Sequence, residues 1–91
     1  MKVRLRTGFW QLTEGELTLE ADRLCLRTAE QELFSIPLTE LQSFSLWHTH
    51  RFRLETETEV WEGSIPSRED SALLLQQLCG RSRDLQVLFR P

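Results

Sequence analysis

The chain of 91 residues has only two cysteines, Cys25 and Cys79, which are far apart and form no CxxC pair. This pattern favours reduced thiols in a cytosolic protein over a disulfide framework. The sequence also has no run of the ~18 apolar residues that a membrane helix needs, and its first residues lack the features of a secretory signal peptide. We therefore expect a cytoplasmic protein that does not span a membrane.

Linkers, repeats and an excess of basic residues are absent too. Residues 1–80 contain no internal repeat, low-complexity tract or linker rich in proline, glycine or serine, so the sequence predicts no second domain. Its 40% apolar and 27% charged residues are typical of a globular protein. Because the net charge is −3 and a general nucleic-acid binder is basic over most of one face, we expect no nucleic-acid partner.

Catalytic motifs are also missing, since the sequence has no nucleophile elbow, no HExxH and no glycine-rich phosphate loop. His48 and His50 are spaced by one residue, but zinc usually takes at least three protein ligands. The many carboxylates are explained as the solvated faces of half-buried strands. We expect neither enzymatic activity nor a metal or other cofactor.

What the sequence does contain is a repeated alternation of apolar and polar residues. The stretch GELTLEADRLCLR, residues 15–27, alternates on both sides of Ala21-Asp22. A period of two residues indicates a strand with one buried face. The pattern predicts seven strands, whose apolar positions are Val3 and Leu5; Leu17 and Leu19; Leu24 and Leu26; Phe34, Ile36 and Leu38; Phe44 and Leu46; Phe52 and Leu54; and Trp61, Gly63 and Ile65.

Short, mostly polar segments separate these strands. They are Thr13-Glu14-Gly15, Ala21-Asp22, Ala29-Glu30, Trp47 to His50, and Glu57-Thr58. Connections of this length predict antiparallel hairpins, so we expect the strands to follow one another as a meander.

The period changes at Ser67, where SREDSALLLQQLCG places Ala72 to Leu75 and Leu78 on a helical apolar face. Ser67 is a good N-cap with Asp70 three residues on, and Gly80 is the matching stop. We expect the helix leucines at 74, 75 and 78 to close one end of a barrel and to face strand residues such as Leu19, Phe44 and Phe52.

Seven antiparallel strands and one C-terminal amphipathic helix resemble the pleckstrin-homology (PH) superfold. GELTLEADRLCLR, FSIPLTELQSF and FRLET…VWEGSIPS followed by the helix are similar to passages of its GRAM-like and bacterial PH-like branch, and the resemblance as a whole covers about residues 3–79. The resemblance implies a seven-stranded antiparallel split β-barrel capped by the helix, with a PH/GRAM-like domain at residues 1–80 and a C-terminal tail at 81–91. It also implies binding of lipid headgroups, peptides or proteins, and not catalysis.

Lys2, Arg4 and Arg6 fall on one face of the first predicted strand. In PH domains that bind phosphoinositides, basic residues of the first strands hold the headgroup phosphates, so the resemblance makes these three side chains candidates. An arginine fork can donate two parallel hydrogen bonds to a phosphate. Three exposed basic residues can also serve only to keep an edge strand soluble.

Two further features enter the binding hypothesis. Trp47, at a predicted hairpin tip, can anchor a membrane or a partner, or can close the end of the barrel. Arg51 and Arg53 form a second basic pair, although the glutamates at 55, 57 and 59 can pair with them.

The function that we expect is a non-enzymatic PH/GRAM-like module that binds a protein partner or associates with itself. The tail favours this, because its apolar residues would otherwise form an exposed patch, so it should dock on its own domain or on a neighbouring chain. These residues are Leu85, Val87, Leu88 and Phe89. The alternative is peripheral binding to the headgroups of an anionic membrane surface through Lys2, Arg4 and Arg6, with Trp47 as an anchor.

Overall fold

The computed structural model describes residues 1–8, 11–48, 50–79 and 85–90, and within them the chain is mainly β with one helix. The strands are β1 (Lys2–Arg6), β2 (Leu12–Glu20), β3 (Arg23–Arg27), β4 (Glu32–Pro37), β5 (Leu41–Trp47), β6 (Arg51–Thr56), β7 (Val60–Ser64) and β8 (Gln86–Arg90). The helix α1 (Arg68–Leu78) lies between β7 and β8 in the chain.

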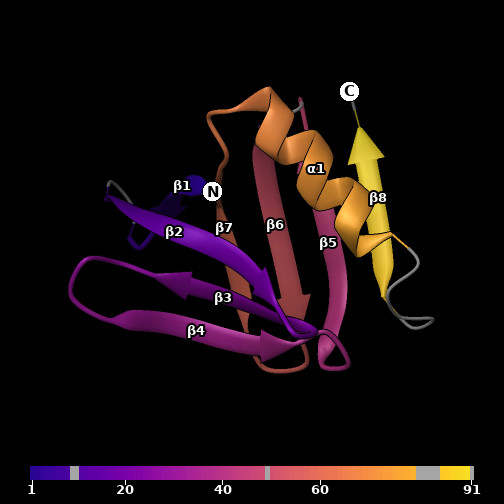
Figure 1. Cartoon of the computed structure of the whole chain (residues 1–91), viewed down its shortest axis with the longest axis horizontal. Coiled ribbons are helices and arrows are strands. Elements are labelled where there is room, and N and C mark those ends of the chain that lie inside the picture. Colours follow the sequence, from indigo (N-terminus) through magenta and orange to yellow (C-terminus); the bar gives the residue numbers. More distant parts are fainter. Residues whose placement is uncertain (9–10, 49, 80–84, 91) are drawn as a thin grey trace.

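The strands form one sheet in the order β4-β3-β2-β1-β7-β6-β5-β8. Figure 1 shows that this sheet is folded into two crossed halves: β2, β3 and β4 run across the front, and β7, β6, β5 and β8 stand behind them. The inner face of the rear half is covered by β2–β4 at the lower left and by α1 at the upper right. The core therefore lies between the two halves and under α1.

The expected seven-stranded antiparallel barrel is wrong in three respects. The apolar tail supplies an eighth strand, which pairs with β5 in parallel rather than antiparallel orientation. A parallel pair needs a crossover connection, and the chain from β5 to β8 provides one through α1. The sheet is also not closed, because β4 and β8 are its two edges and do not pair with each other.

The meander prediction is wrong at one point, since β4 and β5 follow one another in sequence but are not neighbours in the sheet. The two halves are instead joined by β1 and β7, where Arg4 lies opposite Ser64 and Leu5 opposite Gly63. This junction brings the first strand beside the last hairpin, which local sequence spacing does not show.

Thr13-Glu14-Gly15, predicted as a turn, lies inside β2 and pairs with Leu5, Arg4 and Val3 of β1. Polar residues occupy this part of the strand because one of its faces is exposed. Gly15 lies where the backbone of β3 comes close to β2. A Cβ at Gly15 would lie 3.1 Å from the carbonyl oxygen of Arg27. Another predicted turn, Ala21-Asp22, is confirmed and has left-handed φ angles of 45° and 65°, as a tight hairpin turn requires.

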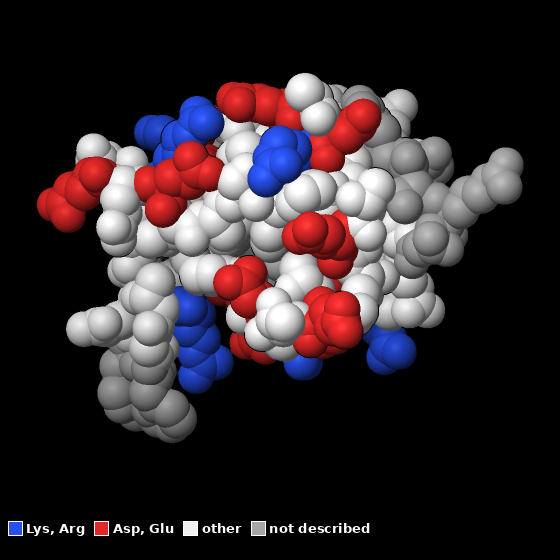
Figure 2. Space-filling model, turned by 90° about the horizontal axis from the view of Figure 1, so that it is seen from below, with Lys and Arg blue, Asp and Glu red and all other residues white. Residues whose placement is uncertain are grey.

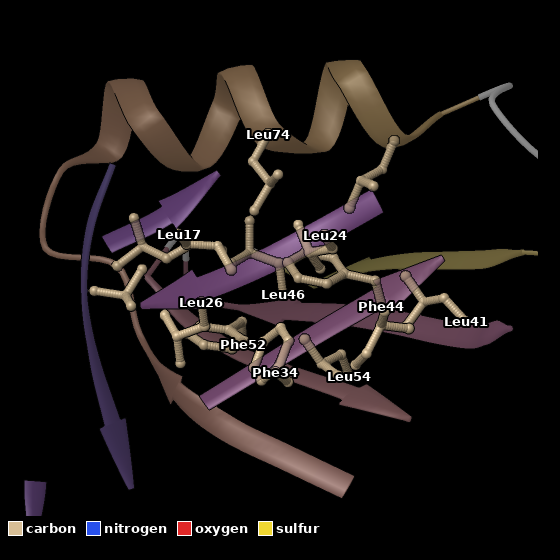
Figure 3. Close-up of a cluster of buried hydrophobic side chains, with 14 of the residues drawn as sticks. Leu17, Leu24, Leu26, Phe34, Leu41, Phe44, Leu46, Phe52, Leu54 and Leu74 are labelled. Atoms are coloured by element: carbon tan, nitrogen blue, oxygen red, sulfur yellow. The ribbon is translucent and has the colours of Figure 1, made fainter. Parts of the chain in front are cut away.

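Leucine and phenylalanine side chains of both half-sheets meet in the core (Figure 3). The rings of Phe44 and Phe52 are stacked with their centroids 6.1 Å apart, and Phe34 packs against Trp61 at 5.0 Å. Leu74 points from α1 into this cluster, toward the strands below the helix. These contacts hold the rear half-sheet in place and so fix the position of its outer face.

The predicted cap of α1 is confirmed, because the backbone N–H of Asp70 donates a hydrogen bond of 3.2 Å to Ser67 Oγ. Leu74 and Leu78 are fully buried as expected, whereas Leu75 is only half-buried and lies beside β8. Because the sheet is open, α1 covers an inner face instead of closing a barrel end. The predicted stop at Gly80 and the domain boundary after it lie outside the described residues.

Candidate functional site

The outer face of the rear half-sheet consists of the side chains that point away from the core on β1, β7, β6, β5 and β8. One cross-strand row runs from Trp47 to Arg51, then to Ser64 and to Arg4. The next row runs from Ser45 to Arg53 and to Glu62. β2–β4 and α1 lie on the other side of the rear half-sheet, against its inner face (Figure 1).

A hollow of about 600 Å³ opens on this outer face beside the β5–β6 turn. Three arginines line it, Arg6 from β1 and Arg51 and Arg53 from β6, and we call it the basic hollow. Its other lining residues are Leu12, Trp47, His48, His50, Phe52, Glu62, Gly63 and Ser64. Arginine therefore outnumbers carboxylate three to one around a cavity of a net acidic chain.

The arginines of the basic hollow differ in their counter-ions. Arg53 Nε lies 2.9 Å from Glu55 Oε1 and 3.7 Å from Glu62 Oε1, so its charge is already balanced. Arg51, in contrast, makes no ion pair or side-chain hydrogen bond with any residue in the described ranges. The positive charge of Arg51 is therefore available to an anion that enters the hollow.

The turn that borders the basic hollow has a defined local geometry. His48 has a left-handed φ of 53°, and His50 Nδ1 lies 2.7 Å from the carbonyl oxygen of His48. Because a carbonyl oxygen only accepts, Nδ1 of His50 is the donor in this hydrogen bond. This contact holds the His50 ring against the turn.

The predicted binding residues are only partly brought together. Arg6, Trp47, Arg51 and Arg53 line the basic hollow, while Lys2 and Arg4 line a second depression with Glu14, Glu16, Arg27 and Asp70 among its walls. That depression mixes both charges, and Arg4 Nε lies 4.0 Å from Glu14 Oε1. The basic row expected along the first strand is thus divided between two sites.

The expected pairing of Arg51 and Arg53 with the following glutamates occurs only at Glu55. Glu59 instead accepts a hydrogen bond of 3.4 Å from Trp61 Nε1, and Glu57 lies in the β6–β7 turn. Sequence reasoning treated His48 and His50 only as metal ligands and did not connect them or Glu62 with the arginines. His48 and His50 lie between Trp47 and Arg51 in the chain, and this position was the available signal for the two histidines.

Acidic residues gather at the opposite end of the molecule, where the β2–β3, β4–β5 and β6–β7 turns lie. Figure 2 shows that end with carboxylates spread over its centre and basic side chains mostly at the margins. The exposed acidic residues of these turns are Glu20, Asp22, Glu40, Glu57 and Glu59. The rear half-sheet is therefore basic at the end near the β5–β6 turn and acidic at the end of the β6–β7 turn.

The residues predicted for self-association lie on or beside β8. Leu85 and Val87 pack against the core, while Leu88 and Phe89 remain 42% and 46% exposed. The tail therefore docks on its own domain and still leaves two large apolar side chains in contact with water. Leu88 is on the outer face with Ser45, and Phe89 is on the inner face with Leu46.

Compared with known proteins, the chain matches no family model and no curated protein. Within the described residues, α1 is too short and too polar to cross a bilayer.

Proposed function

We propose that this protein is a non-enzymatic binding module that takes a phosphate group of its ligand into the basic hollow. The observation that carries the proposal is Arg51, a guanidinium that has no counter-ion among the described residues and that lines a cavity where arginines outnumber carboxylates. A guanidinium can donate two parallel hydrogen bonds to phosphate oxygens, and the Ser64 hydroxyl opposite Arg51 can add a third donor.

The surroundings of Arg51 favour a phosphate that is attached to a larger group. Trp47 lies directly opposite Arg51 in the β5–β6 ladder and is half-buried, so its indole offers an apolar wall beside the charge. Leu12, which also lines the basic hollow, is 65% exposed. A lipid headgroup at a membrane surface meets both features, because Trp and leucine enter the interface while arginine holds the phosphate.

We also propose that the fold is a variant of the PH superfold. Two crossed half-sheets with one helix against their open side support this assignment, and the added parallel strand β8 is a departure from it. Under this proposal the phosphate is held at the β5–β6 turn and not along the first strand, where the resemblance puts it.

The test compares a soluble phosphate with a membrane. Pyrophosphate binding is followed by titration calorimetry, and sedimentation is measured with vesicles of phosphatidylcholine alone or with an added phosphatidylinositol phosphate. Arg51→Glu should weaken binding by about tenfold or more, since it replaces the guanidinium that binds the phosphate with a carboxylate that repels it. Arg68→Glu on α1 makes the same charge change outside the hollow and should bind as the wild type does.

The arms of the experiment separate the sources of the phosphate. Binding to both pyrophosphate and anionic vesicles indicates a headgroup ligand, and binding to pyrophosphate alone indicates a soluble one. Vesicle binding should weaken as salt rises from ~0.1 to ~0.5 M, because exposed charges are screened. The proposal is wrong if neither probe binds, or if the two variants weaken binding equally.

A further inference from the structure

The two edges of the sheet differ in how well they are protected. Edge strands are usually blunted by charge, proline or bulges, because their free backbone groups can pair with another chain. β4 has Glu32 at its start and Pro37 at its end, and its pairing with β3 contains a register shift. β8, with the sequence QVLFR, has neither proline nor acidic residue and carries three consecutive apolar side chains. The β8 edge is therefore open to strand addition.

The parallel pairing with β5 determines which backbone groups of β8 are available. The carbonyl oxygen of Arg90 accepts a hydrogen bond of 2.9 Å from the backbone N–H of His48. Backbone groups alternate in direction along a strand, so Gln86 and Leu88 also turn toward β5. Val87 and Phe89 therefore present their N–H and C=O groups at the free edge.

Apolar surface accompanies these free groups on both faces of β8. Leu88 is exposed on the outer face and Phe89 on the inner face. Between Phe89 and α1 lies a groove of about 600 Å³, whose walls include Leu46, Ala72 and Leu75. A strand added to β8 would cover Leu88 and Phe89 and lie beside this groove.

We infer that the added strand is β8 of a second copy of the chain, paired antiparallel about a two-fold axis at Leu88. In this register each Leu88 lies opposite its own counterpart, and Val87 of one copy lies opposite Phe89 of the other. Because Val87 and Phe89 carry the free backbone groups, each such pair exchanges two hydrogen bonds, as an antiparallel ladder requires.

The side chains of β8 are complementary to a second β8. Apolar residues meet apolar residues at the three central positions, and Arg90 of each copy lies opposite Gln86 of the other. The arginines thus sit at opposite ends of the ladder, where they do not repel each other. A two-fold contact also pairs the β8 edge of one copy with the β8 edge of the other, so the contact closes as a dimer and does not extend through β8 into a fibre.

The test measures molar mass by light scattering after size exclusion, over about 1 to 100 µM protein. Val87→Pro removes an N–H at the free edge and leaves the groups that face β5 in place. Leu88→Lys places two like charges across the axis. Both changes should weaken the dimer by about tenfold or more. Leu73→Lys alters a side chain of α1 that is 49% exposed and should leave the dimer unchanged.

A cross-linking experiment keeps the inference testable if these variants fold poorly. Residues opposite each other in a pair without mutual hydrogen bonds have Cα atoms about 4.5 Å apart, which a disulfide can span. Leu88→Cys in a Cys79→Ser background should form a disulfide-linked dimer under mild oxidation, and Leu73→Cys in that background should not. A wild type that stays monomeric overturns the inference, as does a dimer that neither β8 variant weakens or that Leu88→Cys fails to cross-link.

Discussion

Leu74 and Leu78 are the fully buried leucines of α1, and truncation of Leu74 to alanine tests how the helix packs on the sheet. The side chain has no exposed surface, and it points from α1 into the cluster around Leu17, Leu24 and Leu46. Removing its branched end loses the transfer free energy of those carbons and leaves a cavity. For a buried leucine the two terms together cost about 2–5 kcal/mol. The total stability of a small domain is only about 5–15 kcal/mol, so Leu74→Ala should remove a large share of it.

The neighbouring Leu73 provides a matched control. It is on the same helix and is 49% exposed, so Leu73→Ala makes the same change in helix propensity without opening a cavity. We expect a change in unfolding free energy within about 0.5 kcal/mol for Leu73→Ala. Leu75→Ala should fall between the two, because Leu75 is half-buried beside β8.

Urea unfolding followed by circular dichroism measures these differences, provided that the slope of free energy against urea stays the same among the variants. If Leu74→Ala lies within about 0.5 kcal/mol of Leu73→Ala, the helix does not pack on the inner face as described.

Two further substitutions test the elements next to the candidate sites. Ser67→Ala removes the oxygen that accepts from the Asp70 N–H and should cost about 0.5–2 kcal/mol in urea unfolding, whereas Ser67→Asp should keep the cap. Gly63→Ala at the junction of β1 and β7 would put a Cβ against the carbonyl oxygen of Arg4 and 2.9 Å from ring carbons of Phe52. It should cost about 1–3 kcal/mol, and a thermal midpoint equal to that of wild type would contradict this packing.

Local patterns in the sequence predicted those parts of the fold that depend on neighbouring residues. The hairpin around Ala21 and Asp22 is set by a two-residue turn with flanking alternation, and both are readable in the chain. The start of α1 is set by Ser67 and Asp70 in the same way. Local physical chemistry fixes these features, so no knowledge of distant partners is needed.

The remaining features depend on pairings between distant segments. Thr13-Glu14-Gly15 has the composition of a turn, but pairing with Val3 to Leu5 keeps it in a strand. Val87, Leu88 and Phe89 are consecutive apolar residues, so alternation could not show that they form a strand or that it runs parallel to β5. The basic hollow likewise requires β1 to lie beside β7, which brings Arg6 near Arg51.

The dimer and the phosphate site are linked by the geometry of the sheet. Residues opposite each other in an antiparallel pair point to the same side, so a β8–β8 contact would turn the outer faces of both copies the same way. Each basic hollow lies close to the axis, because Trp47 on β5 is directly beside Arg90 on β8.

A surface with many phosphates would then engage both hollows, whereas a soluble phosphate engages one at a time. Linked sites raise apparent affinity by about 10²–10⁴. Val87→Pro should therefore weaken binding to anionic vesicles and leave the calorimetric affinity for pyrophosphate unchanged. If Val87→Pro weakens both assays equally, the loss does not come from two basic hollows that engage one membrane surface together.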